Sequence, residues 1–272
     1  MSKIADNTRT IDLAQNVRLV TAFAALALVP MIVAHVIGAE VVNPLLDPIS
    51  WYAFVPGGAL MITIGGSLLA VLGQLLMVRM YRRRLVHGPV PAVAMIIFSV
   101  ALVLVGICHT DPPQPGVTIA DGSLAATVHR ISAGMAFVAL PVVGVALARS
   151  ISAPVSRLPK ALCRSAYGLA VLVGAFLSIH LPLAFVGSGI ADFGLIERAG
   201  FVIMIGFLFL IAATIDRETT ARTAVPATGS QAAAVAVADS NERRQTSDHG
   251  VGLKPSLVSA SLESTTYGRV KM

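Results

Sequence analysis

The sequence predicts an all-α, polytopic membrane protein: a six-transmembrane-helix bundle with both termini in the cytoplasm. Three observations support this fold class: the overall composition, the clustering of apolar residues in long runs, and the distribution of basic residues. Apolar residues make up 56% of the 272 residues and charged residues only 12%, and the mean hydropathy is +0.80. A soluble domain rarely has this composition. The apolar residues gather in six long runs, and most basic residues fall on one side of those runs.

Each apolar run is long enough to cross a bilayer as a helix. About 20 residues, each rising 1.5 Å, cross the roughly 30 Å of hydrocarbon. A helix also pairs its own backbone polar groups, as lipid requires, and the alternation of a membrane β-barrel is absent from these segments. The six runs are Leu19–Gly38, Phe54–Val78, Val90–Cys108, Ile131–Ala148, Tyr167–Val186 and Ala199–Ile215.

The positions of lysine and arginine predict the orientation. Three lie in the N-terminal tail, four between the second and third runs, four between the fourth and fifth, and seven in the C-terminal tail. Only Arg130 and Arg198 lie on the other side, and the positive-inside rule makes the crowded side cytoplasmic. We therefore expect a multi-pass protein of the cell membrane, with Trp51 and Tyr52 in the outer aromatic belt.

Three parts of the chain follow from this topology. Residues 1–17 form a cytoplasmic N-terminal tail, residues 18–216 the transmembrane domain, and residues 217–272 a cytoplasmic tail. The composition of the last part, rich in Ala, Ser and Thr with scattered charge, predicts disorder. The first run is too long for the core of a signal peptide, so we interpret it as a span.

Several classes of protein are excluded. The high pI of about 9.8 follows from membrane topology, and no nucleic-acid-binding fold is apparent. The two cysteines, Cys108 and Cys163, fall on opposite sides of the membrane and cannot pair within one chain. No phosphate-binding loop is present, which excludes an ATP-driven pump acting alone. Within the second run, Gln74 and several glycines indicate close contact with a neighbouring helix.

Ionisable residues gather at the outer ends of the runs. Six acids outnumber two arginines there, which favours a cation or metal over an anion. Four of the six histidines belong to the same set, so we expect a polar pocket at the outer leaflet. The set is His35, Glu40, Asp47, His109, Asp111, Asp121, His129, Arg130, His180, Asp192, Glu197 and Arg198.

A divalent metal is one candidate ligand of this pocket. His109, Asp111 and His129 flank the loop between the third and fourth runs, and His180 interrupts the fifth run two residues before Pro182. Two or three histidines with a carboxylate suit zinc, although the spacing matches no established zinc motif. A haem between His129 and His180 is a further alternative. The simpler alternative is that each histidine bonds a neighbouring helix.

Glu197 and Arg198 begin the sixth run. Adjacent helix positions point about 100° apart, so we expect each residue to meet a different helix. Arg198 is expected to pair with Asp111 or Asp47 and hold the outer helix ends together. Alternatively, Glu197 acts as a general acid or base, with Asp111 and His129 as the other candidates for that role.

Short motifs at these positions carry a family resemblance. They are Asp47-Pro48-Ile49-Ser50-Trp51-Tyr52, the segment from Gly106 to Asp111, His129, and Gly194-Leu195-Ile196-Glu197-Arg198. Over about residues 15–216 the chain resembles the bacterial integral membrane family known as domain of unknown function 998. The resemblance implies the six-span fold and marks Ser50, Asp111, His129, Glu197 and Arg198 as polar positions of the family. Cys108-His109-Thr110 departs from its pattern, and the family has no settled activity.

Three functions remain in view at this point. The first is a binding, sensory or accessory protein with a pocket formed by Asp47, Ser50, His109, His180 and Arg198, whose partners are membrane lipids or a lipid-like small molecule. The second is a membrane enzyme that acts on a lipid or isoprenoid substrate. The third is a small transporter, for which the expected inverted repeat is not apparent.

Overall fold

The computed structural model describes residues 15–112, 121–186 and 193–224, the last four without their side chains. These residues form six α-helices and one 3-10 helix, and contain no strand. The elements are α2 (Gln15–Ile37), η1 (Ile49–Phe54), α3 (Gly58–Arg82), α4 (Val90–Ile107), α5 (Leu124–Ser150), α6 (Leu158–Phe185) and α7 (Phe193–Ala224). All six α-helices are long and apolar enough to cross a membrane, which confirms the predicted spans.

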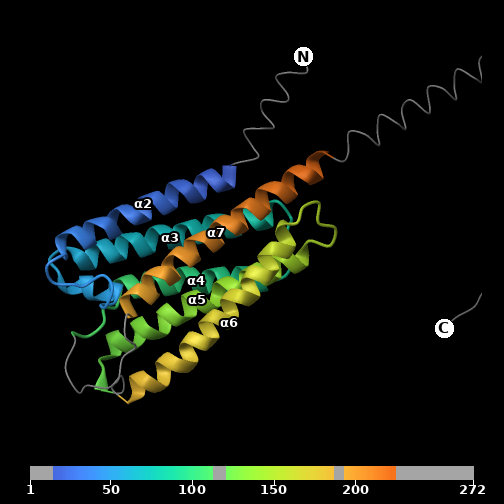
Figure 1. Cartoon of the computed structure of the whole chain (residues 1–272). Helices are drawn as coiled ribbons and strands as arrows, with labels where there is room; N and C mark the ends of the chain where they lie inside the picture. The colour runs from blue at the N-terminus through green and yellow to red at the C-terminus, as the bar shows by residue number, and fades with distance from the viewer. Residues whose placement is uncertain (1–14, 113–120, 187–192, 225–272) are drawn as a thin grey trace, which may run out of the picture. The chain divides into compact units, whose positions relative to one another are not determined.

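The helices pack in chain order, and α7 completes the bundle by contacting both α2 and α6 (Figure 1). Consecutive helices run in opposite directions, so the bundle has two ends. We call the end with η1 and the start of α7 the Arg198 end. The end with the start of α2 and the last turns of α7 is the Asp216 end.

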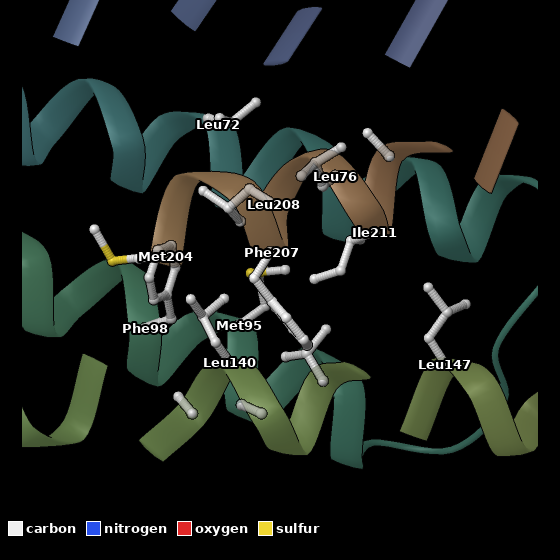
Figure 2. Close-up of a cluster of buried hydrophobic side chains, with 14 of the residues drawn as sticks. Leu72, Leu76, Met95, Phe98, Leu140, Leu147, Met204, Phe207, Leu208 and Ile211 are labelled. Carbon is white, nitrogen blue, oxygen red and sulfur yellow. The ribbon is translucent and has the colours of Figure 1, made fainter. Parts of the chain in front are cut away.

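Apolar side chains from α3, α4, α5 and α7 fill the centre of the bundle (Figure 2). Leu72, Met95, Leu140 and Leu208 are each fully buried. Between α3 and α4 the predicted close contact is confirmed, because Gln74 donates hydrogen bonds to the Ser99 hydroxyl (2.7 Å) and the Met95 carbonyl (3.2 Å).

The helix boundaries differ from those that hydropathy predicts. The helix α5 begins at Leu124 and α6 at Leu158, seven and nine residues before the predicted starts, because their first turns are polar or amphipathic and lower the local hydropathy. Conversely, α3 begins only at Gly58. Residues 49–54 form η1, and Gly57 takes the left-handed backbone conformation (φ +81°) that separates the two helices.

The predicted boundary at residue 216 is also too early, since α7 continues to Ala224. Glu218, assigned to the tail by the sequence, is 1% exposed. Its carboxylate accepts hydrogen bonds from the Val155 and Ser156 backbone N–H groups (both 3.2 Å) and the Ser156 hydroxyl (2.7 Å). The last turns of α7 therefore hold the loop between α5 and α6. The predicted disorder of the tail lies, from residue 225 on, outside the described residues.

Asp216 connects the last helix, α7, to the start of the first described helix, α2. Its carboxylate accepts hydrogen bonds from the backbone N–H of Asn16 (3.2 Å), the side-chain amide of Asn16 (2.6 Å) and the backbone N–H of Val17 (3.0 Å). The first N–H groups of a helix lack partners inside the helix, so Asp216 caps α2 from α7. Arg79 of α3 donates to the Asn16 side-chain oxygen and joins a third helix to this contact.

We expect Asp216→Asn to lower the free energy of unfolding by about 2 kcal/mol, because the amide places a donor against N–H groups that need an acceptor. Glu40→Gln, which changes an exposed acid at the Arg198 end, should stay within about 0.5 kcal/mol of the wild type. Denaturant unfolding of the detergent-solubilised proteins measures both. Equal effects of the two substitutions would contradict a capping role of Asp216.

Candidate functional site

The loop after α2 is folded around its own polar groups. The Asp47 carboxylate accepts a hydrogen bond from the Asn43 backbone N–H (2.7 Å), and the Asn43 side-chain oxygen accepts one from the Leu45 N–H (3.0 Å). The Asp47 carboxylate is thus hydrogen-bonded within its own loop. This leaves the backbone carbonyls of residues 45–47 to contact the rest of the Arg198 end.

The first turn of α7 docks on those carbonyls. The Gly194 and Leu195 N–H groups donate to the carbonyls of Leu46 (3.2 Å) and Leu45 (2.9 Å), which satisfies two donors that the start of a helix leaves unpaired. A Cβ atom at Gly194 would lie 2.2 Å from the Asp47 carbonyl oxygen. Only glycine permits this approach.

Arg198, one turn further along α7, joins three segments. Its guanidinium donates to the carbonyls of Asp47 (3.0 Å) and Gly194 (2.8 Å), to the Tyr52 hydroxyl (3.3 Å) and to Nε2 of His35 (3.1 Å). The Arg198 guanidinium carbon also lies 5.8 Å from the centre of the Tyr52 ring. Nδ1 of His35 donates to the Met31 carbonyl (2.7 Å), and Nε2 accepts the hydrogen bond from Arg198.

This arrangement corrects two details of the sequence interpretation. Arg198 does hold the helix ends together, but it bonds the backbone carbonyl of Asp47 rather than a carboxylate. Tyr52, expected in an aromatic belt, is instead 1% exposed beneath the guanidinium. The sequence did contain a signal for the contacts of Arg198 with His35 and Tyr52, since both partners are polar groups at the same predicted membrane depth. Their convergence depended on how the helices are rotated.

Glu197 binds the same segment as Arg198. Its carboxylate accepts a hydrogen bond of 2.5 Å from the Ile49 N–H, at the start of η1, while Ser50 is half-buried in the next position. The expectation that adjacent residues meet different helices is therefore wrong for this pair. The segment from Asp47 to Tyr52 crosses the end of the bundle and presents partners to both side chains.

His129 and Asp111 close the loop between α4 and α5. Nδ1 of His129 donates to the carbonyls of Cys108 (2.8 Å) and Val105 (3.1 Å), which the end of α4 leaves unpaired. The Asp111 carboxylate accepts from the Ser123 hydroxyl (2.6 Å) and N–H (2.8 Å), and the Ser123 hydroxyl in turn caps α5 through the Ala126 N–H (3.1 Å).

The hydrogen bond from the Ser123 hydroxyl holds the pKa of Asp111 below its ordinary value of 3.8, assisted by the Ser123 N–H and by the charge of Arg130.

Two histidines at this end have a ring nitrogen without a partner. Nε2 of His109 and Nδ1 of His180 are buried and form no hydrogen bond among the described residues. The His180 ring lies between two phenylalanines, with centroid distances of 5.1 Å to Phe176 of α6 and 4.9 Å to Phe193 of α7. Asp192, which precedes Phe193, lies outside the described residues.

The expected metal ligands are not brought together. Among the described residues, no group of three or more His, Cys, Asp and Glu side chains is placed to hold a metal ion. The carboxylate of Asp111 and Nδ1 of His129 are already bonded to the loop and to α4. A metal at His109, Asp111, His129 and His180 thus has no preformed site in this part of the chain.

Fold and site together define a six-span helical membrane protein whose polar side chains at the Arg198 end tie a folded loop to helix termini. The chain matches, over residues 21–214, the family described as Protein of unknown function (DUF998), and it belongs to that family. No curated protein and no solved structure matches it.

Gly194→Ala tests the docking of α7 on the loop. The new methyl group meets the Asp47 carbonyl at 2.2 Å, so we expect a loss of about 2–3 kcal/mol in unfolding free energy. Gly174→Ala in α6 is the matched control, because a Cβ there meets nothing within 4 Å, and alanine stabilises a helix by up to about 1 kcal/mol. Unfolding in detergent compares the two. A Gly194→Ala protein as stable as the control would contradict the docking contact.

The lowered pKa of Asp111 predicts that the stability of the protein depends on pH. The folded-state pKa of Asp111 is depressed, so its contribution to stability is complete above the ordinary value of 3.8 and disappears as the pH falls through the folded-state value. The melting temperature of the wild type should exceed that of Asp111→Asn by a constant amount from pH 7 to pH 5, and the difference should vanish only in stronger acid. A difference that fades between pH 7 and pH 5 would contradict the assignment.

Proposed function

We propose that the protein is a non-catalytic, membrane-embedded binding protein that takes up a lipid-like molecule beside His180 on α6. The observation that supports it is the buried Nδ1 atom of His180, which has no hydrogen-bond partner among the described residues. A buried polar atom without a partner costs about 1–3 kcal/mol, and a ligand with a hydroxyl, carbonyl or similar group would supply the missing bond.

The exposure of α6 gives such a ligand a path from the bilayer. Only 6% of the most apolar stretch of α6 is buried, against 33–50% for the other five spans. In residues 170–186 no side chain is fully covered, and the positions that face the bundle, including Phe176 and His180, are half-buried. A molecule dissolved in the membrane can therefore reach His180 without opening the packed core.

The surroundings of His180 indicate the chemical class of the ligand. The rings of Phe176 and Phe193 stack on the imidazole and favour an apolar body. Arg130, an exposed residue of α5, carries a positive charge at the same end of the bundle and disfavours a cationic head group. We propose an amphiphile with an uncharged hydrogen-bonding head, because the acids that outnumber the arginines at this end disfavour an anionic one.

The hydrogen bonds of the candidate acid–base residues favour this role over catalysis. Glu197 is bonded to the start of η1, Asp111 to Ser123, and His129 to the end of α4. A general acid or base must instead reach a proton of the substrate. We also propose the orientation given by the positive-inside rule, which places both termini in the cytoplasm and His180 toward the outer leaflet.

His180→Phe tests the proposal, because it keeps the stacked ring and removes the nitrogen. Native mass spectrometry of the protein extracted in mild detergent should detect a retained lipid-like molecule in the wild type. We expect at least about tenfold less of it in His180→Phe, as the loss of one buried hydrogen bond implies. His87→Phe, which changes an exposed loop histidine, should retain the molecule.

A second measurement separates binding from folding. Without ligand, His180→Phe should melt at the same temperature as the wild type or higher, because it removes an unpaired polar atom. A wild type that carries no bound molecule, or equal retention by wild type and His180→Phe, would overturn the proposed function.

A further inference from the structure

A second apolar feature lies at the opposite end of the bundle, between α4 and α5. It is a groove of about 290 Å³, lined by Pro89, Val90, Val93, Ala94, Ile97, Met135, Val138, Ala139 and Val142. The side chains that line it are all apolar in the part of the chain that the structure describes. Val90 and Val93 on one wall and Val142 on the other are each more than 40% exposed, so the groove opens to the surroundings of the bundle.

The length and position of the groove match one leaflet of a membrane. Its α4 wall runs from Pro89 to Ile97, about 12 Å at 1.5 Å per residue, compared with about 15 Å for half of the hydrocarbon thickness. It begins at the first residues of α4, where the polar loop ends. A single acyl chain that starts at the membrane surface would therefore lie along it for nearly the depth of its leaflet.

Basic side chains lie at the same end of the bundle as the start of the groove, in the segment that leads from α3 into α4. The Tyr81 hydroxyl donates to the Gly88 carbonyl (2.6 Å) and accepts from the Ala92 N–H (3.2 Å), so the last turn of α3 packs against the first turn of α4. Arg82 and Arg83 follow Tyr81 directly. Both are exposed, and their guanidinium groups form no hydrogen bond or ion pair with other described residues.

The two described acids of the Asp216 end are bonded elsewhere. Asp216 is bonded to the start of α2, and Glu218 to the loop between α5 and α6. Arg149, near the end of α5 beyond Val142, adds a further exposed positive charge and donates to the Tyr167 hydroxyl (2.6 Å). An apolar groove at an end of the bundle whose described surface carries exposed arginines complements a lipid that has an anionic head group.

We infer that the groove between α4 and α5 is a binding site for an anionic membrane phospholipid, with one acyl chain along the groove and the phosphate at Arg82 and Arg83. This site goes beyond the proposed function and does not rest on it. It lies at the other end of the bundle and uses none of the residues around His180.

Two tryptophan substitutions test the chain site. Val93→Trp fills one wall of the groove, and Val142→Trp fills the other should the first fail to fold. Val100→Trp is the matched control, since Val100 is also on α4 and is as exposed as Val93, at 52%, but lies outside the groove. The full-length protein is titrated with phosphatidylglycerol or phosphatidylcholine of identical acyl chains, and bound lipid is counted by native mass spectrometry.

We expect the wild type and Val100→Trp to bind phosphatidylglycerol at least about fivefold more tightly than phosphatidylcholine, and the groove variants to lose about tenfold in affinity for the former. Equal binding by Val93→Trp and Val100→Trp would overturn the inference. So would a Val93→Trp protein that changes its oligomeric state and not its lipid binding, because a second copy would then occupy the groove.

The head-group site is tested separately. The double substitution of Arg82→Gln and Arg83→Gln should remove most of the preference for phosphatidylglycerol, at about fivefold per arginine. Arg18→Gln, an exposed arginine at the same end on α2, should leave the preference unchanged. Repeating the titrations in His180→Phe distinguishes the two proposed sites, because this variant lacks the His180 nitrogen and keeps every residue of the groove. A preference that survives the double substitution would overturn the placement of the phosphate.

Discussion

Hydrocarbon offers no hydrogen-bond partner, so each helix end in this protein needs a partner from the chain itself or from the membrane surface. This constraint explains most of the polar side chains in the bundle. Asp216 caps the start of α2, His129 takes up the last carbonyls of α4, and the carbonyls of the first loop receive the start of α7. An acid or histidine without a hydrogen bond would be energetically unfavourable at these positions, and each of these groups has a hydrogen bond.

The last helix connects parts of the chain that are far apart in sequence. Near its start, Arg198 contacts His35 of α2, and near its end Asp216 contacts Asn16 at the beginning of the same helix. The first and last spans are therefore fixed to each other at both ends, while Glu218 secures the loop before α6. Within α6, Tyr167 accepts a hydrogen bond from Arg149 of α5, and the described residues beyond Tyr167 have no comparable tie. The second half of α6 is the least covered part of the described bundle, which is why the proposed ligand site lies there.

Hydropathy and charge predicted the number of spans because both depend only on residue type along the chain. They also indicated which polar residues share a membrane depth. They did not predict which of these meet, because that depends on helix rotation. His35 and Tyr52 meet Arg198, whereas Asp111 is bonded to Ser123 and His129 to the end of α4. Helix ends were misplaced for a related reason, since polar first turns and the buried Glu218 lower the hydropathy of residues that are nevertheless helical.

The polar groups of the Arg198 end thus fall into two kinds. Those that are hydrogen-bonded to other parts of the chain, such as Arg198 and His129, hold the loops and helix ends. His109 and His180 differ, because each has a buried ring nitrogen that bonds nothing in the described chain, and His180 also sits between two phenylalanine rings. A phenylalanine would stack there equally well and avoid the cost of the unpaired atom. Under the proposed function, a ligand supplies the bond that the His180 nitrogen lacks among the described residues, and α6 is the least buried of the six spans.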